Sequence, residues 1–312
     1  MDGDGDVVFV YLGGEQEVPY EITHAFIDPS VNIVRRRAFR NRRRLVSIIF
    51  HDGVEMIEAD AFFNCESLSG RIVLLGVREI RERAFDGCYA LSDVEFGDRL
   101  ETIGEWAFAS CSLRSIKIPS VRSVQTGAFV YCSQLTDAEF GINLRTIGRH
   151  SFHDCPNLLR ITIPLKYNLF RFDSDNQRYD QFDECEDLTT VDIVGTEKIH
   201  KTISSLLMGS WSDEMNDEID RINWELRGTP SRGKTRLIRR WIRSVINRLD
   251  HYKVEHNLLL KEGMALLELA IWKAKLDEKA KFDTTSARNE QRIMSGADIV
   301  IRNVVPFLQL DE

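Results

Sequence analysis

Hydrophobic residues along this chain recur with a long and regular period. A Phe returns about every 23 residues, with successive spacings of 23, 23, 23, 21, 23 and 30, and a Leu follows each Phe five or six positions later. Self-similarity at a fixed period of this length is typical of a solenoid, in which each repeat buries its apolar face against its neighbours. The repeated residues are Phe39, Phe62, Phe85, Phe108, Phe129, Phe152 and Phe182.

Each repeat divides into two halves. The first half reads A-F-x-x-C-x-x-L, and its apolar residues lie near helical spacing, which predicts one or two helical turns that bury the Phe. The second half alternates apolar and polar residues, as from Leu91 to Phe96, which predicts a short strand. A polar turn leads from there to a second extended stretch that ends at Ile103-Gly104. We therefore expect an α/β repeat solenoid.

The period also defines the parts of the chain. Residues 1–6 alternate Asp and Gly after the first Met and predict a mobile terminus. Residues 7–37 predict an N-terminal cap and partial repeat, with a strand around Val7–Leu12, because a solenoid needs an end that covers its core. Residues 38–199 hold the full repeats, and their longer last period indicates an insertion near residues 166–180.

The last part of the chain, residues 200–312, has a different pattern. Apolar residues recur at spacings of three and four over Ile203–Leu226, which predicts an amphipathic helix. A Thr-Pro pair at 229–230 is typical of a helix start and precedes a second apolar stripe, and residues 282–290 are polar and break that pattern. We expect an all-α helical hairpin or small bundle.

Composition restricts the class of protein. The 312 residues carry a net charge of −8, which disfavours non-specific binding to nucleic acid or acidic membranes. No stretch approaches the ~18 consecutive apolar residues of a membrane span, and the N-terminus lacks the cationic region of a signal peptide. We expect no membrane association and a cytoplasmic or nuclear location.

The cysteines follow the repeat. Each lies three residues after its Phe, so the same position in stacked coils forms a ladder of small apolar side chains. This periodicity favours buried free thiols over disulfides or a metal site, which needs paired cysteine spacings. The six residues are Cys65, Cys88, Cys111, Cys132, Cys155 and Cys185.

The repeats resemble the BspA-like class of leucine-rich repeats. The A-F-x-x-C-x-x-L cores, the I-x-I-P strands at 116–119 and 161–164, and the L-x-x-I-G turns at 100–104 and 144–148 carry this resemblance. It covers roughly residues 22–195 and implies a curved solenoid with a parallel sheet on one face that binds proteins. Many bacterial relatives are surface adhesins, a role that the absence of a secretion signal does not favour here.

The whole chain also resembles a large uncharacterised set of diatom leucine-rich-repeat proteins with a helical tail. The segments TISSLL, HYKVEHNLLLKE, LLELAIWKAKLDEK and SGADIVIRNVVPFL carry this second resemblance. It supports the division into repeats and tail and implies no activity.

Residues 228–235, GTPSRGKT, fit the phosphate-loop pattern G-x-x-x-x-G-K-[ST]. A phosphate loop follows a buried strand, whereas this segment follows one predicted helix and opens another. We therefore keep a nucleotide-binding regulator as an alternative function, and a second alternative is a passive structural protein whose tail helices self-associate. The sequence predicts no catalytic residues, no cofactor and no metal site, because nucleophiles and bases are scattered and His251 and His256 lie five apart.

An arginine-rich stretch opens the first full repeat. One interpretation is a solvated rim, and the other is an import signal or a patch for an acidic partner. The residues are Arg35, Arg36, Arg37, Arg40, Arg42, Arg43 and Arg44, of which Arg42 occupies the ladder position that cysteine fills in later coils.

The candidate binding surface is the sheet face. In each strand the residue between two core positions points outward, and stacking aligns these residues in a row on the concave face. The row is mixed in charge but acidic through the middle, which favours a basic protein or peptide partner. We expect non-catalytic recognition or scaffolding through this row, with a tail for packing or self-association. The row contains Ile49, Val73, Glu95, Lys117, Glu139, Thr162 and Asp192, with Asp93 and Asp137 beside it.

Overall fold

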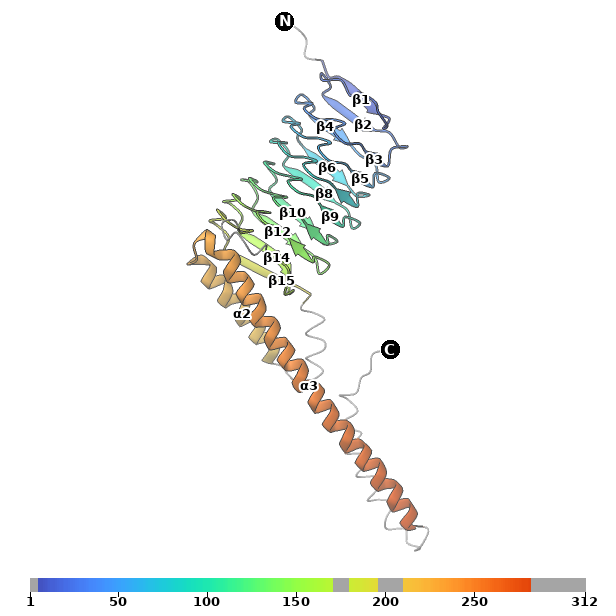
Figure 1. The fold of residues 1–312 in the computed structure, drawn as a ribbon, viewed down its shortest axis with the longest axis vertical. Helices are drawn as coiled ribbons and strands as arrows, with labels where there is room; N and C mark the ends of the chain where they lie inside the picture. The colour runs from blue at the N-terminus through green and yellow to red at the C-terminus, as the bar shows by residue number, and fades with distance from the viewer. Residues whose placement is uncertain (1–4, 171–179, 196–209, 282–312) are drawn as a thin grey trace. The chain divides into compact units, whose positions relative to one another are not determined.

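The computed structural model describes three ranges of the chain, residues 5–170, 180–195 and 210–281 (Figure 1). The chain forms two compact units. One consists of residues 1–196 with 216–243, and the other of residues 197–215 with 244–312. The first unit contains the repeats, whose coils are stacked in sequence order.

One strand from each coil lies on the same face of the solenoid, which we call the sheet face. Neighbouring strands pair in parallel within the groups β1-β2-β4, β6-β8 and β10-β12-β14-β15. This arrangement confirms the parallel sheet that the family resemblance implied. The strands are β1 Val8–Tyr11, β2 His24–Ile27, β4 Ser47–Ile49, β6 Arg71–Leu74, β8 Asp93–Phe96, β10 Ser115–Ile118, β12 Asp137–Phe140, β14 Arg160–Pro164 and β15 Thr190–Val194.

A second parallel ladder runs along another face, which confirms the second extended stretch of each repeat. Its strands are two residues long and pair in the order β13-β11-β9-β7-β5-β3. Beyond β13, Phe170 forms an isolated parallel β-bridge with Ile147. Residues 171–179, which make up most of the predicted insertion, lie outside the described residues. The strands are β3 Ile33–Val34, β5 Met56–Ile57, β7 Glu79–Ile80, β9 Thr102–Ile103, β11 Ser123–Val124 and β13 Thr146–Ile147.

The third face consists of stacked turns, so the prediction of helical turns in the first half of each repeat was wrong. The amide of Phe39 donates to the carbonyl of Ala61 in the next coil at 2.7 Å, whereas the amide of Arg40 closes a local turn onto Arg37 at 3.1 Å. Arg37 and Asn41, four residues apart, have a φ of 60°, and the amides of residues 37, 39 and 41 all donate to the next coil. An α-helix would have directed all these amides along its own axis.

A stack of Phe rings fills the core. Consecutive rings from Phe39 to Phe182 have centroids 4.9 to 5.7 Å apart and interplanar angles of 5° to 20°. Tyr11 extends the stack at the N-terminal end, with its ring centroid 5.2 Å from that of Phe39. These spacings are those of offset-stacked aromatic pairs, so the repeat distance of the coils suits the rings as well as the backbone.

The cysteines form the predicted ladder. All six are buried and free, and each thiol donates a hydrogen bond to the carbonyl of a Phe in the preceding coil. The Cys65 Sγ lies 3.0 Å from the Phe39 carbonyl oxygen, for example. Burial raises the pKa of the Cys65, Cys132 and Cys185 thiols to about 12. These thiols therefore stay protonated near neutral pH and are poor nucleophiles.

Two helices are described after the repeats, α2 Ser210–Arg227 and α3 Ser231–Lys281. The predicted start of the first helix, residues 203–209, lies outside the described residues, as do the polar residues 282–290 and the rest of the chain. The Thr229 hydroxyl donates to the carbonyl of Glu225 at the end of α2, and α3 begins directly after the Thr-Pro pair. Neither described helix has an apolar stretch of the length and hydropathy that crossing a bilayer needs.

The hairpin between α2 and α3 covers the C-terminal end of the solenoid. The Thr235 hydroxyl accepts a hydrogen bond from the amide of Phe182 at 3.2 Å, where earlier coils use the carbonyl of the next coil. The Lys234 side chain donates to the carbonyls of Cys185 and Glu186. Both hairpin residues are buried. Side chains of the hairpin thus replace the coil that would otherwise follow.

Truncation of one ring in the stack should destabilise the array strongly. Phe108 is fully buried between two other rings, so Phe108→Ala should lower the free energy of unfolding by ~3–5 kcal/mol. Urea denaturation followed by circular dichroism measures this loss. Tyr89→Ala, at a side chain that is 56% exposed, is the control and should cost less than ~1 kcal/mol. Equal losses would show that the stack is not the main core contact.

The thiol ladder predicts a loss of stability at alkaline pH. In the unfolded chain a thiol ionises with a pKa of about 8.5, whereas Cys65, Cys132 and Cys185 have pKa values of about 12 in the folded state. Between these values the folded state holds more protons, so raising the pH favours unfolding. Urea midpoints should fall as the pH rises above about 9, and Cys132→Ala should reduce that slope by about one proton. Stability that is unchanged between pH 8 and pH 10 would contradict the ladder.

Removal of the lysine cap should destabilise the end of the solenoid. Lys234→Met keeps the buried aliphatic chain but removes two charge-assisted hydrogen bonds, and it should cost about 2–4 kcal/mol in urea denaturation. Arg236→Met, at an exposed position two residues further along, is the matched control and should change stability by less than ~0.5 kcal/mol. A silent Lys234→Met would show that the hairpin does not depend on this contact.

Candidate functional site

The sheet face carries two parallel rows of outward side chains. Strand register places Val73 beside Glu95, Lys117 beside Glu139, and Thr162 beside Asp192. Within each of the three paired strand groups, residues of the predicted row are therefore neighbours. The row also extends further toward the N-terminus than predicted, because Val10 pairs with Phe26 and Phe26 with Ile49. Val10 and Phe26 were missed because they precede the first Ala-Phe pair, where the repeat pattern is incomplete.

The acidic character of the predicted row is largely neutralised by cross-strand ion pairs. Glu95 Oε2 lies 2.6 Å from Arg71 Nη2, and Glu139 Oε1 lies 2.9 Å from Lys117 Nζ. Asp192 Oδ2 lies 3.6 Å from Arg160 Nε. Arg71 and Arg160 belong to the adjacent outward row, two positions before the predicted row in their strands, which is why sequence analysis did not pair them.

Asp93 and Asp137 occupy the same position in the adjacent row, at the starts of β8 and β12. Asp137 Oδ2 accepts a hydrogen bond from the Thr136 hydroxyl at 2.7 Å. These two carboxylates are the part of the predicted acidic surface for which no ion pair is found within the described residues. The row is therefore mixed in charge, as predicted, with its acidic groups mostly paired.

The N-terminal end of the sheet face is apolar and exposed. Val10, Phe26 and Ile49 lie side by side in the strand register, and they are 47%, 41% and 55% exposed. The edge of β1 is partly covered by Gln16, whose side chain accepts from the amide of Leu12 and donates to the carbonyl of Val10. Gln16 thereby occupies edge groups that could otherwise pair with another strand. We call Val10, Phe26 and Ile49 the apolar row.

The arginine-rich stretch is folded into the first full coil. Arg37 and Arg40 both approach the carboxylate of Asp60 in the next coil, at 3.3 and 3.1 Å. Arg43 pairs with Glu66 at 3.0 Å, and Arg35 lies 3.9 Å from Glu58.

Arg42, at the ladder position of the first coil, donates to the carbonyl of Val18 and stacks over the ring of Tyr20. Arg42 thereby donates a hydrogen bond to a backbone carbonyl at the N-terminal end of the ladder, as the cysteine thiols do in later coils. The partners of Arg42 and of the paired arginines support a structural role for much of the stretch, and its use as an import signal or binding patch stays a prediction.

The phosphate-loop-like segment lies between two helices and does not follow a strand, as the sequence predicted. It joins α2 to α3, and its Lys234 and Thr235 are the two buried residues that cap the solenoid. The lysine that would contact phosphate oxygens is already hydrogen-bonded to two backbone carbonyls.

One Ser-His-Asp arrangement occurs that sequence analysis did not identify. His24 Nδ1 lies 2.6 Å from Ser47 Oγ, and His24 Nε2 lies 3.4 Å from Asp6 Oδ1. Acyl transfer also requires donors aimed at the oxyanion, but the amides of Val46 and Ser47 both donate to the Thr23 carbonyl. We interpret the group as a polar cross-strand contact. Within the described residues, no three His, Cys, Asp or Glu side chains gather as a metal site would need.

Solved structures similar to this chain include leucine-rich repeat proteins. A leucine-rich repeat protein from Bacteroides ovatus is 27% identical, with a TM-score of 0.48 over 55% of this chain and 45% of that chain. The leucine-rich repeat protein of T. pallidum is 24% identical, with a TM-score of 0.42 over 57% of this chain and 82% of that chain. The chain thus spans less than half of the B. ovatus protein. No curated protein matches the sequence.

The sequence itself matches six copies of the BspA type leucine rich repeat region, over residues 19–73 and 71–189. These residues make up more than half of the chain, and they correspond to the coils described above. This protein therefore belongs to the BspA-type leucine-rich repeat family.

Proposed function

We propose that the protein recognises or scaffolds other proteins through the sheet face of its repeats. The single observation that carries this proposal is the apolar row, three large side chains that the fold brings together and leaves about half exposed. Monomeric proteins expose contiguous apolar surface mainly where something binds. The repeat fold is consistent with this role, because stacked coils give a broad and rigid surface.

The apolar row would contribute mainly affinity, and the ion-paired rows mainly specificity. Covering the exposed parts of Phe26 and Ile49 would each contribute on the order of 1 kcal/mol, since full burial of such a side chain contributes ~1.5–3 kcal/mol. The paired charges from β6 to β15 would add specificity and register more than affinity. We expect a partner with apolar residues over β1, β2 and β4 and polar groups over the later strands.

The expected basic character of the partner rests on the overall charge of the protein more than on the sheet face. Three of the five carboxylates on the sheet face already have cationic neighbours, so the face does not attract cations as a purely acidic row would. The overall charge of −8 still favours encounter with a basic protein over an acidic one at long range. A basic partner therefore remains part of the proposal.

A second candidate role, self-association through the tail, is favoured by α3. Side chains on several sides of this helix are exposed and apolar, including Leu258 at 55%, Leu266 at 60% and Trp272 at 61%. A helix with apolar residues around much of its surface needs a partner to cover them. Analytical ultracentrifugation of the full chain and of the Leu266→Glu with Trp272→Glu variant would test this role. We expect an oligomer for the wild type and a monomer for the variant, and a monomeric mass for the wild type would exclude self-association.

We also propose a cytoplasmic or nuclear location and a non-catalytic role. The six buried free thiols support a reducing compartment, because oxidising compartments favour disulfides. The nucleotide-binding alternative predicts a higher melting temperature in the presence of nucleotide, since ligands that bind the folded state stabilise it. The similarity to diatom proteins stays a prediction.

Disruption of the apolar row should abolish partner capture while leaving the fold intact. Full-length Phe26→Asp with Ile49→Asp should retain a partner from native lysate at least about tenfold less well than wild type, because both changes place charge in a desolvated contact. Quantitative mass spectrometry of captured proteins measures the difference, and melting temperatures check the fold.

Two double variants serve as controls for this experiment. Tyr89→Asp with Tyr131→Asp changes comparably exposed aromatic residues on the turn face and should capture normally. Glu95→Lys with Glu139→Lys reverses paired carboxylates and should weaken capture less than the apolar change does. Normal capture by the Phe26 and Ile49 variant would refute the sheet face as the binding surface.

A further inference from the structure

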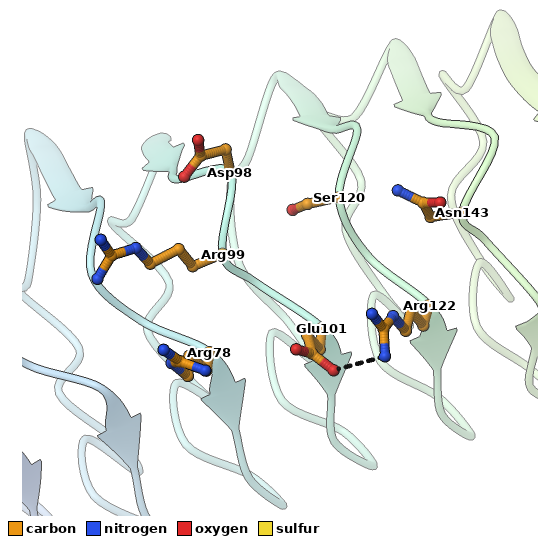
Figure 2. A pocket seen from close by; sticks show the side chains of 7 residues that line it. All are labelled: Arg78, Asp98, Arg99, Glu101, Ser120, Arg122 and Asn143. Carbon is orange, nitrogen blue, oxygen red and sulfur yellow. Dashed lines mark ion pairs between the residues drawn. The ribbon is translucent and has the colours of Figure 1, made fainter.

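A pocket lies in the middle of the array, where the chain turns from the sheet face to the second-ladder strands β7, β9 and β11. Its volume is about 310 Å³, and its walls include Arg78, Arg99 and Arg122 together with Asp98 and Glu101. Figure 2 shows Arg78, Glu101 and Arg122 at the starts of successive second-ladder strands, with Arg99 and Asp98 in the turn above them. We call this site the arginine pocket.

The backbone ladder fixes the spacing of these side chains. The amide of Glu101 donates to the carbonyl of Arg78, and the amide of Arg122 donates to the carbonyl of Glu101, both at 2.8 Å. The amide of Arg145 continues the column by donating to the carbonyl of Arg122. These residues therefore stand one coil apart. In the core, the ring centroids of Phe85 and Phe108, which also lie one coil apart, are separated by 5.1 Å.

The guanidinium groups of the pocket are incompletely paired. Arg122 Nη1 lies 3.1 Å from Glu101 Oε2, which accounts for one pair. Arg78 and Arg99 have no carboxylate within ion-pair distance among the described residues, although both are exposed beside one another in the pocket. Elsewhere in the array, Arg71, Arg81 and Arg160 each pair with a carboxylate. The pocket is thus a locally cationic surface on a protein of net charge −8.

We propose that the arginine pocket binds carboxylate side chains from an acidic segment of a protein partner. Guanidinium groups bind carboxylates through two parallel hydrogen bonds, and Arg78 and Arg99 present two such groups in one pocket. The Arg122–Glu101 ion pair is one guanidinium–carboxylate contact already present in the pocket. The walls are polar, so an acidic peptide fits them better than an apolar ligand does.

The charges within the pocket favour a carboxylate over a phosphate. Three guanidinium groups and two carboxylates line the pocket, so a ligand with one negative charge balances the net charge of its walls. A carboxylate carries one negative charge, whereas a phosphorylated side chain carries nearly two at neutral pH. This second surface is independent of the proposed function, because its residues contribute nothing to the apolar row.

The test uses the full-length protein and a fluorescein-labelled peptide of alternating Glu and Gly. Fluorescence anisotropy should show binding that weakens as salt is raised toward physiological strength. Arg78→Glu with Arg99→Glu should lower the affinity by at least about tenfold, because it replaces both unpaired cations with anions. Arg78→Lys with Arg99→Lys should cause a smaller loss, because lysine keeps the charge but lacks the planar donor pair.

The matched control is Arg114→Glu with Arg236→Glu, which changes the net charge equally at exposed arginines outside the pocket and outside the arginine-rich stretch. It should alter affinity by less than about twofold if binding is local. Equal losses in the two Glu variants, or no binding by wild type, would overturn the proposal.

Two further arms make the result specific. A matched peptide with phosphoserine in place of Glu should bind no better than the Glu peptide, and binding of the phosphopeptide alone would overturn the assignment to carboxylates. The Phe26→Asp with Ile49→Asp variant should bind the Glu peptide as wild type does. That comparison separates failure of the pocket from failure of the proposed sheet-face function. Melting temperatures of all variants establish that each is folded, and Arg78→Gln with Arg99→Gln replaces the Glu variant if it is not.

Discussion

Hydrogen bonds between the backbones of successive coils are the interaction on which this structure depends. On the turn face, every second amide donates to the next coil, which requires left-handed backbone at residues such as Arg37, Asn41 and Glu184. Each such non-glycine residue costs about 1–2 kcal/mol relative to a right-handed conformation. The hydrogen bonds and the stacked Phe rings offset that cost only while a neighbouring coil is present, so both ends of the array need substitutes.

The two ends solve this problem with side chains. At the N-terminal end, Tyr11 continues the ring stack and Arg42 takes the ladder position of cysteine. At the C-terminal end, Thr235 accepts the amide hydrogen bond that a further coil would have accepted, and Lys234 meets two carbonyls. The segment that matches the phosphate-loop pattern therefore has a structural role at the end of the solenoid. Lys234 is buried there, and its ammonium group already donates to two backbone carbonyls.

The same ladder that stabilises the coils also arranges the surface. Because parallel register aligns equivalent residues, single outward positions become rows, and their composition changes along the array from apolar at Val10, Phe26 and Ile49 to ion-paired further on. At the ends of these strands the chain turns, and the column from Arg78 through Glu101 and Arg122 to Arg145 places charged side chains one coil apart. Two surfaces of different chemistry thus arise from one repeat.

The sequence by itself determined the repeat, the buried Phe and Leu positions, the thiol ladder, and the presence of helices after the repeats. These follow from periodicity, because stacking forces equivalent residues into equivalent environments. Only the tertiary structure decided that the first half of each repeat is a turn, since local spacing cannot reveal amides directed at the next coil. It also decided which charges pair: Arg71 meets Glu95 across 24 residues through strand register, a contact that no local pattern encodes.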